Sequence, residues 1–422
     1  MLLPYKALGC GGERQEYMGR ENFAAKTKNG TNTNETQIVH LIRRSRLISR
    51  AEIAKITGLT PPAVTNIINK LHEAGSIQED MIGESSGGRR PLLLKINPEI
   101  ARIIVVHVRS EKIIGYVVAP DLQIHHQEIQ NIKKCSKECV LEFLLAIIDR
   151  CLQSSAIPVV AVGVVVRGPV RLREGISVFA PNIGWRNVPL KYIIEEKTGL
   201  VTFVENDARA LTNGEYYYGT VKDAQSMVLL KVSHGIGGGI IFNGKLYRGV
   251  NDSAGEVGHS TIDVTGPLCS CGNYGCLEAM ASENALVDLV AKEIKEGQPS
   301  LVKDYVAGNL EELTPTEIYR AADAGDEVAL RMLNRIARYL GIGIANLVNI
   351  FNPEIVVIAG GIVKAKVHIE AMVKQIVRDR AFESCSSGLD IRFSDKGTEN
   401  TLKGAADLVF TEVTELKLLH SK

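Results

Sequence analysis

Four side chains of the types that commonly bind metal ions lie within one short segment of this chain. If they share one ion, they restrict how that segment can fold. The segment is eighteen residues long, and its thiols are spaced C-x-C and C-x4-C with glycines between them. Three thiolates and one imidazole suit a closed, tetrahedral, structural zinc site, which has no open position for a metal-bound water. The alternative is three free thiols and an unrelated histidine. The expected zinc ligands are His259, Cys269, Cys271 and Cys276.

The composition is that of an ordinary soluble protein. The chain has 422 residues, of which 45% are hydrophobic and 23% charged, and its formal net charge is +1. The length allows two or three domains, and any affinity for nucleic acid must come from a local patch. No apolar run approaches the roughly 20 residues that cross a bilayer, and the first residues lack a secretory pattern. We therefore expect a cytoplasmic protein without membrane insertion, in which Cys135 and Cys139 are ordinary half-buried thiols.

The N-terminal part of the chain divides into a tail and a small helical domain. Residues 1–34 are rich in Gly, Asn, Thr and Lys without periodicity, which predicts a disordered tail. A helical apolar pattern follows, and Ser49 with Glu52 has the sequence of a capping box that opens a second helix. Gly58 ends that helix, and Thr60 caps a third helix with proline at its first position. Two consecutive helices joined by a short glycine-containing turn predict a helix-turn-helix.

Two strand-like runs follow the third helix and predict a β-hairpin wing, so that residues 35–98 form a winged helix-turn-helix domain. The runs are Ser76–Met81 and Pro91–Ile96, and the polar loop 83–90 between them contains glycines and two arginines. Between Thr36 and Pro98 there are nine Lys and Arg residues against five Asp and Glu residues. This domain is therefore basic although the whole chain is nearly neutral.

A basic winged-helix domain is typical of DNA-binding proteins. The second helix of a helix-turn-helix enters the major groove, where Thr and Asn side chains can bond to base edges. Arginines in a wing reach the DNA backbone or the minor groove. The alternative is a module for protein contacts, but the joint occurrence of capped helices and a basic wing favours DNA. The expected contact residues are Arg50, Thr60, Pro62, Thr65, Asn66, Asn69, Lys70, Arg89 and Arg90.

Residues 99–422 have the pattern of an α/β domain. Strand-like runs alternate with helical stretches such as Glu138–Leu152 and Glu327–Asn349. This alternation predicts a mixed-sheet domain in two lobes with a cleft. The strand candidates are Ile103–Val108, Ile113–Val118, Val159–Val166, Val201–Val204, Met227–Val232, Gly239–Phe242 and Ile355–Ala359.

Several segments of this domain occur in the order typical of one bacterial family. They are Ala180–Trp185, Glu205–Ala208, Gly235–Gly239, Leu246–Gly249, Ala254–His259 and Cys269–Glu278. From about Thr36 to its end the chain resembles the ROK family of repressors, open reading frames and sugar kinases. The helix-turn-helix in front resembles the regulator branch of the family. The segments Ser85–Pro91 and Gly258–Asp263 are most similar to xylose repressors within that branch.

The resemblance implies an actin-like ATPase fold in which a sugar binds between the two lobes. Carboxylates and carboxamides suit adjacent sugar hydroxyls because they form two hydrogen bonds in fixed geometry, and charged partners strengthen those bonds. The residues that the resemblance places around the sugar are Asn182, Asn206, Asp207, Glu256, His259 and Glu278.

The resemblance also indicates that kinase activity has been lost. Asp207 holds the position of the kinase general base, but phosphoryl transfer also needs loops that cradle and neutralise phosphates. In the first such loop His107 replaces an acid and Arg109 a glycine, and Ser233–Gly235 stands where kinases have Gly-Thr-Gly. We therefore expect weak or absent ATP binding, no catalytic residue, and in Asp207 a vestigial base that accepts a hydrogen bond from a sugar hydroxyl.

These features together predict a sugar-responsive transcriptional repressor of carbohydrate utilisation genes, and the resemblance favours xylose. A sugar or sugar phosphate would bind in the cleft, and lobe closure would change the spacing of paired DNA-binding heads. Because helix-turn-helix proteins read half-sites related by two-fold symmetry, we expect a palindromic operator and a homodimer or homotetramer. The alternatives are an ATP-dependent sugar kinase that retains a DNA-binding head, and a repressor controlled by a protein partner.

Overall fold

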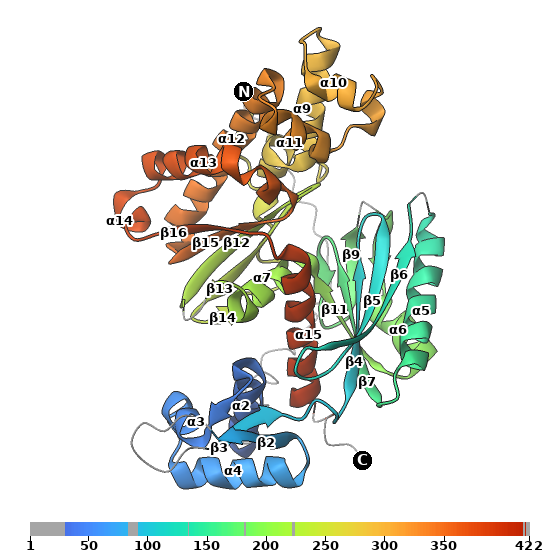
Figure 1. Ribbon diagram of the computed structural model, residues 1–422, viewed down its shortest axis with the longest axis vertical. Helices are drawn as coiled ribbons and strands as arrows, with labels where there is room; N and C mark the ends of the chain where they lie inside the picture. Colours follow the sequence, from blue (N-terminus) through green and yellow to red (C-terminus); the bar gives the residue numbers. More distant parts are fainter. Residues whose placement is uncertain are drawn as a thin grey trace, which may run out of the picture. The chain divides into compact units, whose positions relative to one another are not determined.

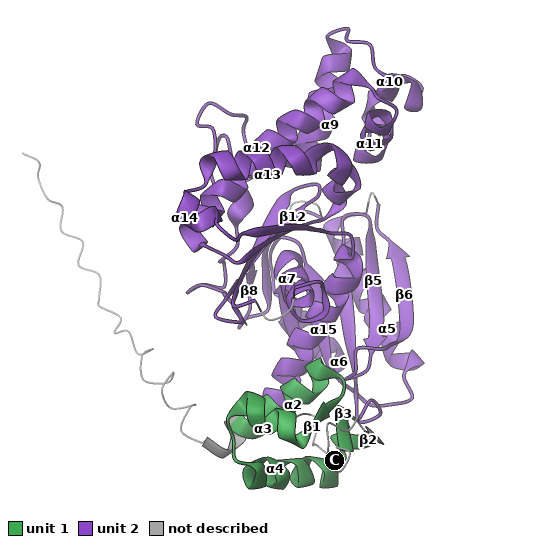
Figure 2. Cartoon of the chain, turned by 60° about the vertical axis from the view of Figure 1, so that its left-hand side comes forward, with its two compact units in different colours: residues 1–96 green, residues 97–422 purple. Residues whose placement is uncertain are grey.

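The computed structural model describes residues 30–82, 92–133, 135–180, 183–221, 224–416 and 418, in two compact units (Figure 2). The division falls between residues 96 and 97, where the sequence analysis placed it after residue 98. Within the described part of the chain, no helix is long and apolar enough to span a membrane.

The first unit consists of helices and a three-stranded antiparallel sheet in the order β1-β3-β2 (Figure 1). Among the described residues its helices begin with α2 at Gly30, so residues 30–34 belong to a helix and not to the expected tail. This first turn is entirely polar, so it has no apolar periodicity that would reveal a helix. Residues 1–29 of that tail lie outside the described residues. The elements are α2 (Gly30–Ser45), β1 (Ile48–Ser49), α3 (Arg50–Thr57), α4 (Pro61–Glu73), β2 (Ile77–Ile82) and β3 (Leu92–Ile96).

The ends of α3 and α4 follow from their local sequences. Ser49 Oγ accepts a hydrogen bond from the Glu52 N–H (3.2 Å), and Glu52 Oε2 accepts one from the Ser49 N–H (2.8 Å), which confirms the capping box. Gly58 ends α3 with φ +70°. Thr60 occupies the N-cap of α4, but its side chain makes no capping hydrogen bond, contrary to the prediction. The helix begins with two prolines, so one of the two usual donors to a capping side chain, the N–H of the second helical residue, is missing.

The helices and sheet of the first unit enclose a core of their own. Its members come from all three helices and from the wing strands, and they are fully or almost fully buried. The central ones are Ile38, Ile42, Ile53, Val64, Ile68, Leu71 and Leu94. The predicted helix-turn-helix followed by a hairpin is therefore confirmed.

The second unit contains two five-stranded mixed sheets and a small antiparallel one (Figure 1). The first sheet has the order β11-β7-β4-β5-β6, the second β14-β13-β12-β15-β16, and the third β10-β9-β8. The first comprises β4 (Arg102–Val108), β5 (Lys112–Val118), β6 (Ile124–Asn131), β7 (Val159–Val166) and β11 (Val201–Asn206). The second comprises β12 (Ser226–Val232), β13 (Ile236–Phe242), β14 (Lys245–Leu246), β15 (Ile355–Ala359) and β16 (Asp390–Ser394). The third comprises β8 (Val170–Arg171), β9 (Ile176–Ala180) and β10 (Trp185–Val188).

Helices cover both faces of each large sheet, so the central strands are apolar throughout. On β4, Ile104 and Val106 face the core beneath α5, while Ile103 and Val105 face the core beneath α15. This two-sided burial explains why β4 and β7 read as continuous hydrophobic runs. The helices are α5 (Lys137–Ser154), α6 (Leu190–Thr198), α7 (Asp207–Tyr218), α8 (Leu277–Ala281), α9 (Glu283–Lys295), α10 (Leu301–Tyr305), α11 (Pro315–Asp323), α12 (Glu327–Phe351), α13 (Lys366–Arg380), α14 (Glu383–Ser386) and α15 (Gly397–Glu415). Short 3-10 turns occur at Val257–His259, Leu310–Glu312 and Gly361–Ala365.

Helices α7 and α15 pack directly against each other between the two large sheets (Figure 1). Glycines permit the close approach. A Cβ atom on Gly214 would lie 1.8 Å from the Asn400 carbonyl oxygen, and one on Gly404 would lie 1.9 Å from the Ala210 carbonyl oxygen. Any side chain at either position would therefore force the helices apart.

Replacing Gly214 with alanine is expected to lower the free energy of unfolding by about 1–3 kcal/mol, the usual cost of overpacking. The loss should occur although alanine at an open helical position stabilises by roughly 0.5–1 kcal/mol. Asn334→Ala, at an exposed position of α12, is the control, since it improves helix propensity without a clash. Chemical denaturation of both variants provides the measurement, and equal stability of Gly214→Ala and wild type would contradict the packing argument.

Candidate functional site

A cleft of about 1100 Å³ opens in the second unit, lined by residues from both large sheets. The loop after β4, the junction of β11 with α7, and the turn between β12 and β13 all contribute to its walls. Ligand sites in open α/β sheets form at the carboxyl ends of parallel strands, and β4, β7 and β11 end here.

Asp207, the first residue of α7, forms an ion pair with Lys231 on β12. Lys231 Nζ donates a hydrogen bond to Asp207 Oδ2. Burial alone would raise the pKa of Asp207, but the nearby Lys231 ammonium outweighs it and holds that pKa below its usual value. Asp207 is therefore an ionised, partnered carboxylate and a poor proton acceptor.

His107, at the end of β4, is buried beside this ion pair. Burial first, and the Lys231 charge second, lower the pKa of His107 to about 3. The imidazole is consequently neutral at physiological pH. A neutral imidazole is a poor ligand for magnesium, which prefers carboxylate and water oxygens.

Asn206 uses most of its side chain to hold the backbone at the start of α7. Its Oδ1 accepts hydrogen bonds from the Ala208 N–H (2.9 Å) and the Arg209 N–H (3.1 Å). Its Nδ2 donates to the Gly168 carbonyl oxygen (2.9 Å). The residue lines the cleft, but its amide can offer a ligand only one further N–H.

Two glutamates on the other side of the cleft differ in their surroundings. Burial raises the pKa of Glu256, and the neighbouring Arg209 guanidinium acts against the shift. Glu278 accepts hydrogen bonds from the Ile236 N–H (2.9 Å) and from Ser270 Oγ (2.9 Å). Glu278 is thus fixed in place, whereas the Glu256 carboxyl has no hydrogen-bond partner among the described residues.

A buried salt bridge secures the loop that carries Glu256. Glu205 accepts hydrogen bonds from Arg209 Nε (2.8 Å) and from Arg248 Nη1 (2.6 Å). Arg209 Nη1 also donates to the carbonyl oxygen of Asp252. Glu205 is the last residue but one of β11, Arg209 lies on α7, and Asp252 lies four residues before Glu256, so this network ties the loop to the start of α7.

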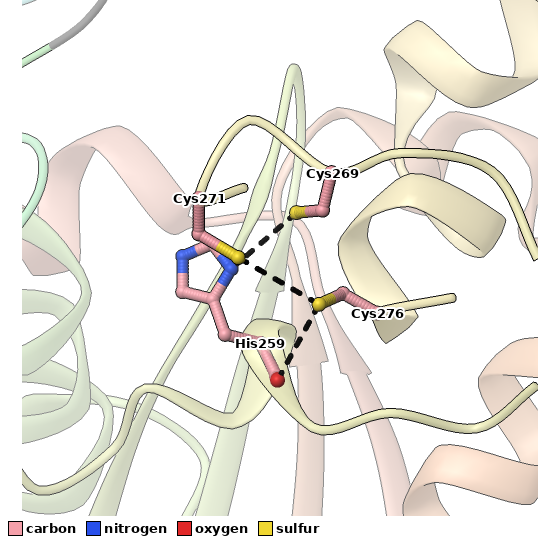
Figure 3. Close-up of side chains that lie close together, drawn as sticks. All are labelled: His259, Cys269, Cys271 and Cys276. Atoms are coloured by element: carbon pink, nitrogen blue, oxygen red, sulfur yellow. Dashed lines mark hydrogen bonds between the residues drawn. The ribbon is translucent and has the colours of Figure 1, made fainter. Parts of the chain in front are cut away.

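The side chains of His259, Cys269, Cys271 and Cys276 point toward one another beside the cleft (Figure 3). Their possible ligand atoms all lie within 4.8 Å of one another. Cys269 Sγ is 3.6 Å from His259 Nδ1, and Cys271 Sγ is 3.8 Å from Cys276 Sγ. The cluster can therefore hold a metal ion, as its spacing predicted.

The structure brings most of the predicted sugar residues together in the cleft. These are Asn206, Asp207, Glu256, His259 and Glu278, whereas Asn182 lies outside the described residues. Sequence reasoning missed Lys231 and Arg167, which also line the cleft. Lys231 left one signal: it is a charged residue within a strand that is otherwise almost entirely apolar and buried.

In the first unit, the predicted recognition helix α4 presents most of its assigned DNA contacts at the surface. Thr60, Pro62, Asn66, Asn69 and Lys70 are exposed, and Thr65 and Arg50 are half-buried. Two of the cations have partners: Lys70 Nζ lies 2.6 Å from Glu35 Oε2, and Arg50 Nη2 lies 3.3 Å from Glu79 Oε1. Exposed ion pairs of this kind contribute about 0–1 kcal/mol to the free energy of unfolding. Both cations can therefore leave their carboxylate partners to contact DNA phosphates. The wing residues Arg89 and Arg90 lie outside the described residues.

Comparison with known proteins identifies both units. The ROK family matches residues 104–412, and a winged helix-turn-helix DNA-binding family matches residues 31–78. The chain belongs to the ROK family. A protein named xylose repressor from Caldicellulosiruptor bescii is 33% identical over 90% of this chain and 96% of its own length.

Solved structures of ROK proteins also match the chain. A ROK-family transcriptional regulator described as a homolog of the E. coli MLC protein superposes with a TM-score of 0.79 at 30% identity, covering 92% of this chain and 98% of its own. A ROK glucokinase from Streptomyces griseus, solved with glucose and AMPPNP, has a TM-score of 0.64 at 29% identity and covers 73% and 99%. The predicted fold, a winged helix-turn-helix followed by an actin-like ROK domain, is confirmed.

The buried neutral state of His107 predicts how stability depends on pH. The unfolded chain binds a proton at His107 below pH 6.5, whereas the folded chain does so only near pH 3, so stability falls as the pH drops below 6.5. At pH 5 this loss amounts to about 2 kcal/mol for a single histidine. The His107→Gln variant should not show this loss. The free energy of unfolding of wild type should therefore fall relative to that of the variant between pH 7 and pH 5.

Thermal or chemical unfolding at several pH values provides the measurement. His125→Gln, at an exposed position of β6, is the matched control and should leave the pH dependence unchanged. Parallel pH profiles for wild type and His107→Gln would show that the imidazole is not held neutral.

Proposed function

We propose that this protein is a DNA-binding transcriptional repressor of carbohydrate utilisation genes that responds to a sugar or sugar phosphate bound in the cleft. The observation that carries the proposal is the presence in one chain of an exposed helix-turn-helix and a cleft lined by Asp207, Glu256 and Glu278. The relative named xylose repressor makes xylose the first candidate effector. Ligand binding would weaken operator binding through a difference in affinity between two states of the protein.

On this proposal, α4 is the recognition helix in the major groove. Asn66 and Asn69 are exposed on it, and asparagine can form a bidentate pair with adenine. The further proposed contacts are Thr60, Pro62, Thr65, Lys70 and Arg50, together with Arg89 and Arg90, which lie outside the described residues. A palindromic operator read by a homodimer or homotetramer fits the two-fold symmetry of helix-turn-helix recognition.

The cleft supports sugar binding better than phosphoryl transfer. Lys231 forms an ion pair with the carboxylate of Asp207, which would have to act as the base of a kinase. A neutral His107 stands where a kinase would need a magnesium ligand. We infer that kinase activity has been lost and that Asp207 accepts a hydrogen bond from a sugar hydroxyl. The second candidate, an ATP-dependent sugar kinase with a DNA-binding head, draws on the similarity to the ROK glucokinase.

We also propose that the His259, Cys269, Cys271 and Cys276 cluster holds a structural zinc ion. A tetrahedral zinc site with metal–sulfur bonds of about 2.3 Å has edges of roughly 3.8 Å. The sulfur–sulfur separation of 3.8 Å and the sulfur–nitrogen separation of 3.6 Å fit that geometry. Zinc would cross-link the chain here and fix the orientation of His259 beside the cleft.

Cys276→Ser is expected to weaken zinc affinity by at least about 100-fold. Even the loss of a residue that only supports a metal ligand lowers metal affinity by about 10–100-fold. Elemental analysis of the purified protein should give one zinc per chain for wild type and substantially less for the variant. Cys135→Ser, on a thiol outside the cluster, is the control. Wild-type protein that contains no zinc after expression in zinc-supplemented medium would contradict the assignment.

A sugar panel tests the function directly. Operator DNA is first selected from a random pool with the full-length protein, and its affinity is then measured with and without xylose and other sugars. The effector should raise the melting temperature and weaken operator binding by about 5–150-fold. The Glu256→Gln variant should still bind the operator, but the sugar should no longer weaken that binding. The Asn66→Ala variant should bind the operator weakly, but the sugar should still raise its melting temperature.

Two outcomes would replace the proposal. Turnover of ATP and a sugar at about 1–100 s⁻¹ in the presence of magnesium would establish the kinase alternative. Operator binding that no free sugar or sugar phosphate alters would support control by a protein partner.

A further inference from the structure

The carboxylate of Glu278 is held at both of its oxygens in the wall of the cleft. Its Oε2 accepts a hydrogen bond from the Ile236 N–H (2.9 Å), and its Oε1 accepts one from Ser270 Oγ (2.9 Å). A single bond would fix one oxygen and leave the plane of the carboxylate free to turn, because the terminal torsion of glutamate is broad. Two bonds to different oxygens fix the plane, so the remaining lone pairs point in set directions toward a ligand.

Both residues of the bond between Ser270 and Glu278 are close in sequence to the metal-binding cluster. Ser270 lies between Cys269 and Cys271, and Glu278 follows Cys276 by two residues. Ser270 Oγ and Glu278 Oε1 are each 4.0 Å from Cys269 Sγ. The hydrogen bond that orients the carboxylate therefore lies directly against a metal-binding thiol.

Ser270 is exposed, so its hydroxyl can orient the carboxylate only if the backbone beneath it is fixed. An exposed side chain on a flexible loop loses conformational entropy when it forms a hydrogen bond. The turn that carries Ser270 limits this loss through two backbone hydrogen bonds, from the Cys269 N–H to the Asn273 carbonyl oxygen (2.7 Å) and from the Gly272 N–H to the Cys269 carbonyl oxygen (2.9 Å). A metal ion shared by Cys269 and Cys271 would clamp the turn on both sides of Ser270.

We propose that Ser270 is a positioning residue, which sets the orientation of Glu278 and couples the metal cluster to the ligand cleft. This role rests on the proposed function, because Glu278 is one of the carboxylates that would bind the sugar. Ser270 acts through Glu278 and makes no contact with the sugar itself. Because coupling between two sites is reciprocal, a bound metal ion strengthens sugar binding, and bound sugar strengthens metal binding by the same factor.

Calorimetric titration of the full-length, zinc-loaded protein tests the positioning role. The probe is the compound that binds wild type most tightly among xylose, glucose, N-acetylglucosamine and their phosphate esters. Ser270→Ala should weaken its binding by about tenfold, as expected for the loss of one hydrogen bond to a charged group, whereas Ser270→Thr retains the hydroxyl and should restore most of the affinity. Asn273→Ala is the matched control, since it removes the bond from Asn273 Nδ2 to Thr261 Oγ1 (3.1 Å) beside the same turn and no partner of Glu278. Melting temperatures and zinc content confirm that each variant is folded and loaded.

A double-mutant cycle shows whether Ser270 acts through the carboxylate. In a Glu278→Ala background, Ser270→Ala should cause no further loss of sugar affinity, because no carboxylate is left to orient. A second loss of about tenfold in that background would show that the hydroxyl binds the sugar directly, and it would overturn the positioning role.

Competition with a chelator measures the coupling between the cleft and the metal cluster. Saturating sugar should raise the zinc affinity of wild type by about tenfold, and this rise should be lost in Ser270→Ala. His259 offers a second route, because it belongs to the cluster and also lines the cleft. A rise that persists unchanged in Ser270→Ala would assign the coupling to His259 and overturn the part given to Ser270.

The positioning role and the proposed function fail separately. If Ser270→Ala binds the sugar as tightly as wild type does, the positioning role is overturned while the repressor proposal stands. If no sugar or phosphate ester binds wild type and none alters operator affinity, both are overturned.

Discussion

The close packing of α7 against α15 is the constraint on which the geometry of the cleft depends. One end of α7 meets α15 through Gly214 and Gly404, and the other end places Asn206 and Asp207 at the cleft. A buried polar network fixes the crossing. Glu215 accepts hydrogen bonds from Ser394 and Asn400, and Asp407 accepts them from Asn213 and Tyr218. Because both helices are held by directional bonds as well as by contact, the cleft-facing end of α7 has a defined position.

Much of this architecture could be predicted from local sequence. The capping box of α3, the glycine end of that helix and the apolar runs of β4, β7, β12 and β15 are local signals, and each was found where the sequence placed it. Other strands escaped prediction. β6 alternates exposed and half-buried polar residues, and β8, β10 and β14 are too short to show a period, so only pairing with neighbours defines them.

The candidate site was predicted unevenly for a similar reason. The metal cluster lies within one segment, so its spacing was visible in the sequence. The partnership of Asp207 with Lys231 joins residues far apart in the chain, and no local pattern indicates which lysine a buried acid will meet. The same holds for Asn206, whose amide was assigned to a sugar but mostly caps α7. Motifs identify the residue types at a site, whereas tertiary contacts decide how many of their bonds remain for a ligand.

The core of the first unit has one further consequence, which concerns the history of the protein. Every buried residue of that core lies between Ile38 and Ile96, so the unit is encoded by one uninterrupted stretch. The Streptomyces griseus glucokinase corresponds to 73% of this chain over 99% of its own length. A single joining of gene segments upstream of a kinase-type domain therefore suffices to combine the two. A change at a cleft residue such as His107 or Lys231 would leave the core of the DNA-binding unit untouched, because none of the residues of that core lines the cleft.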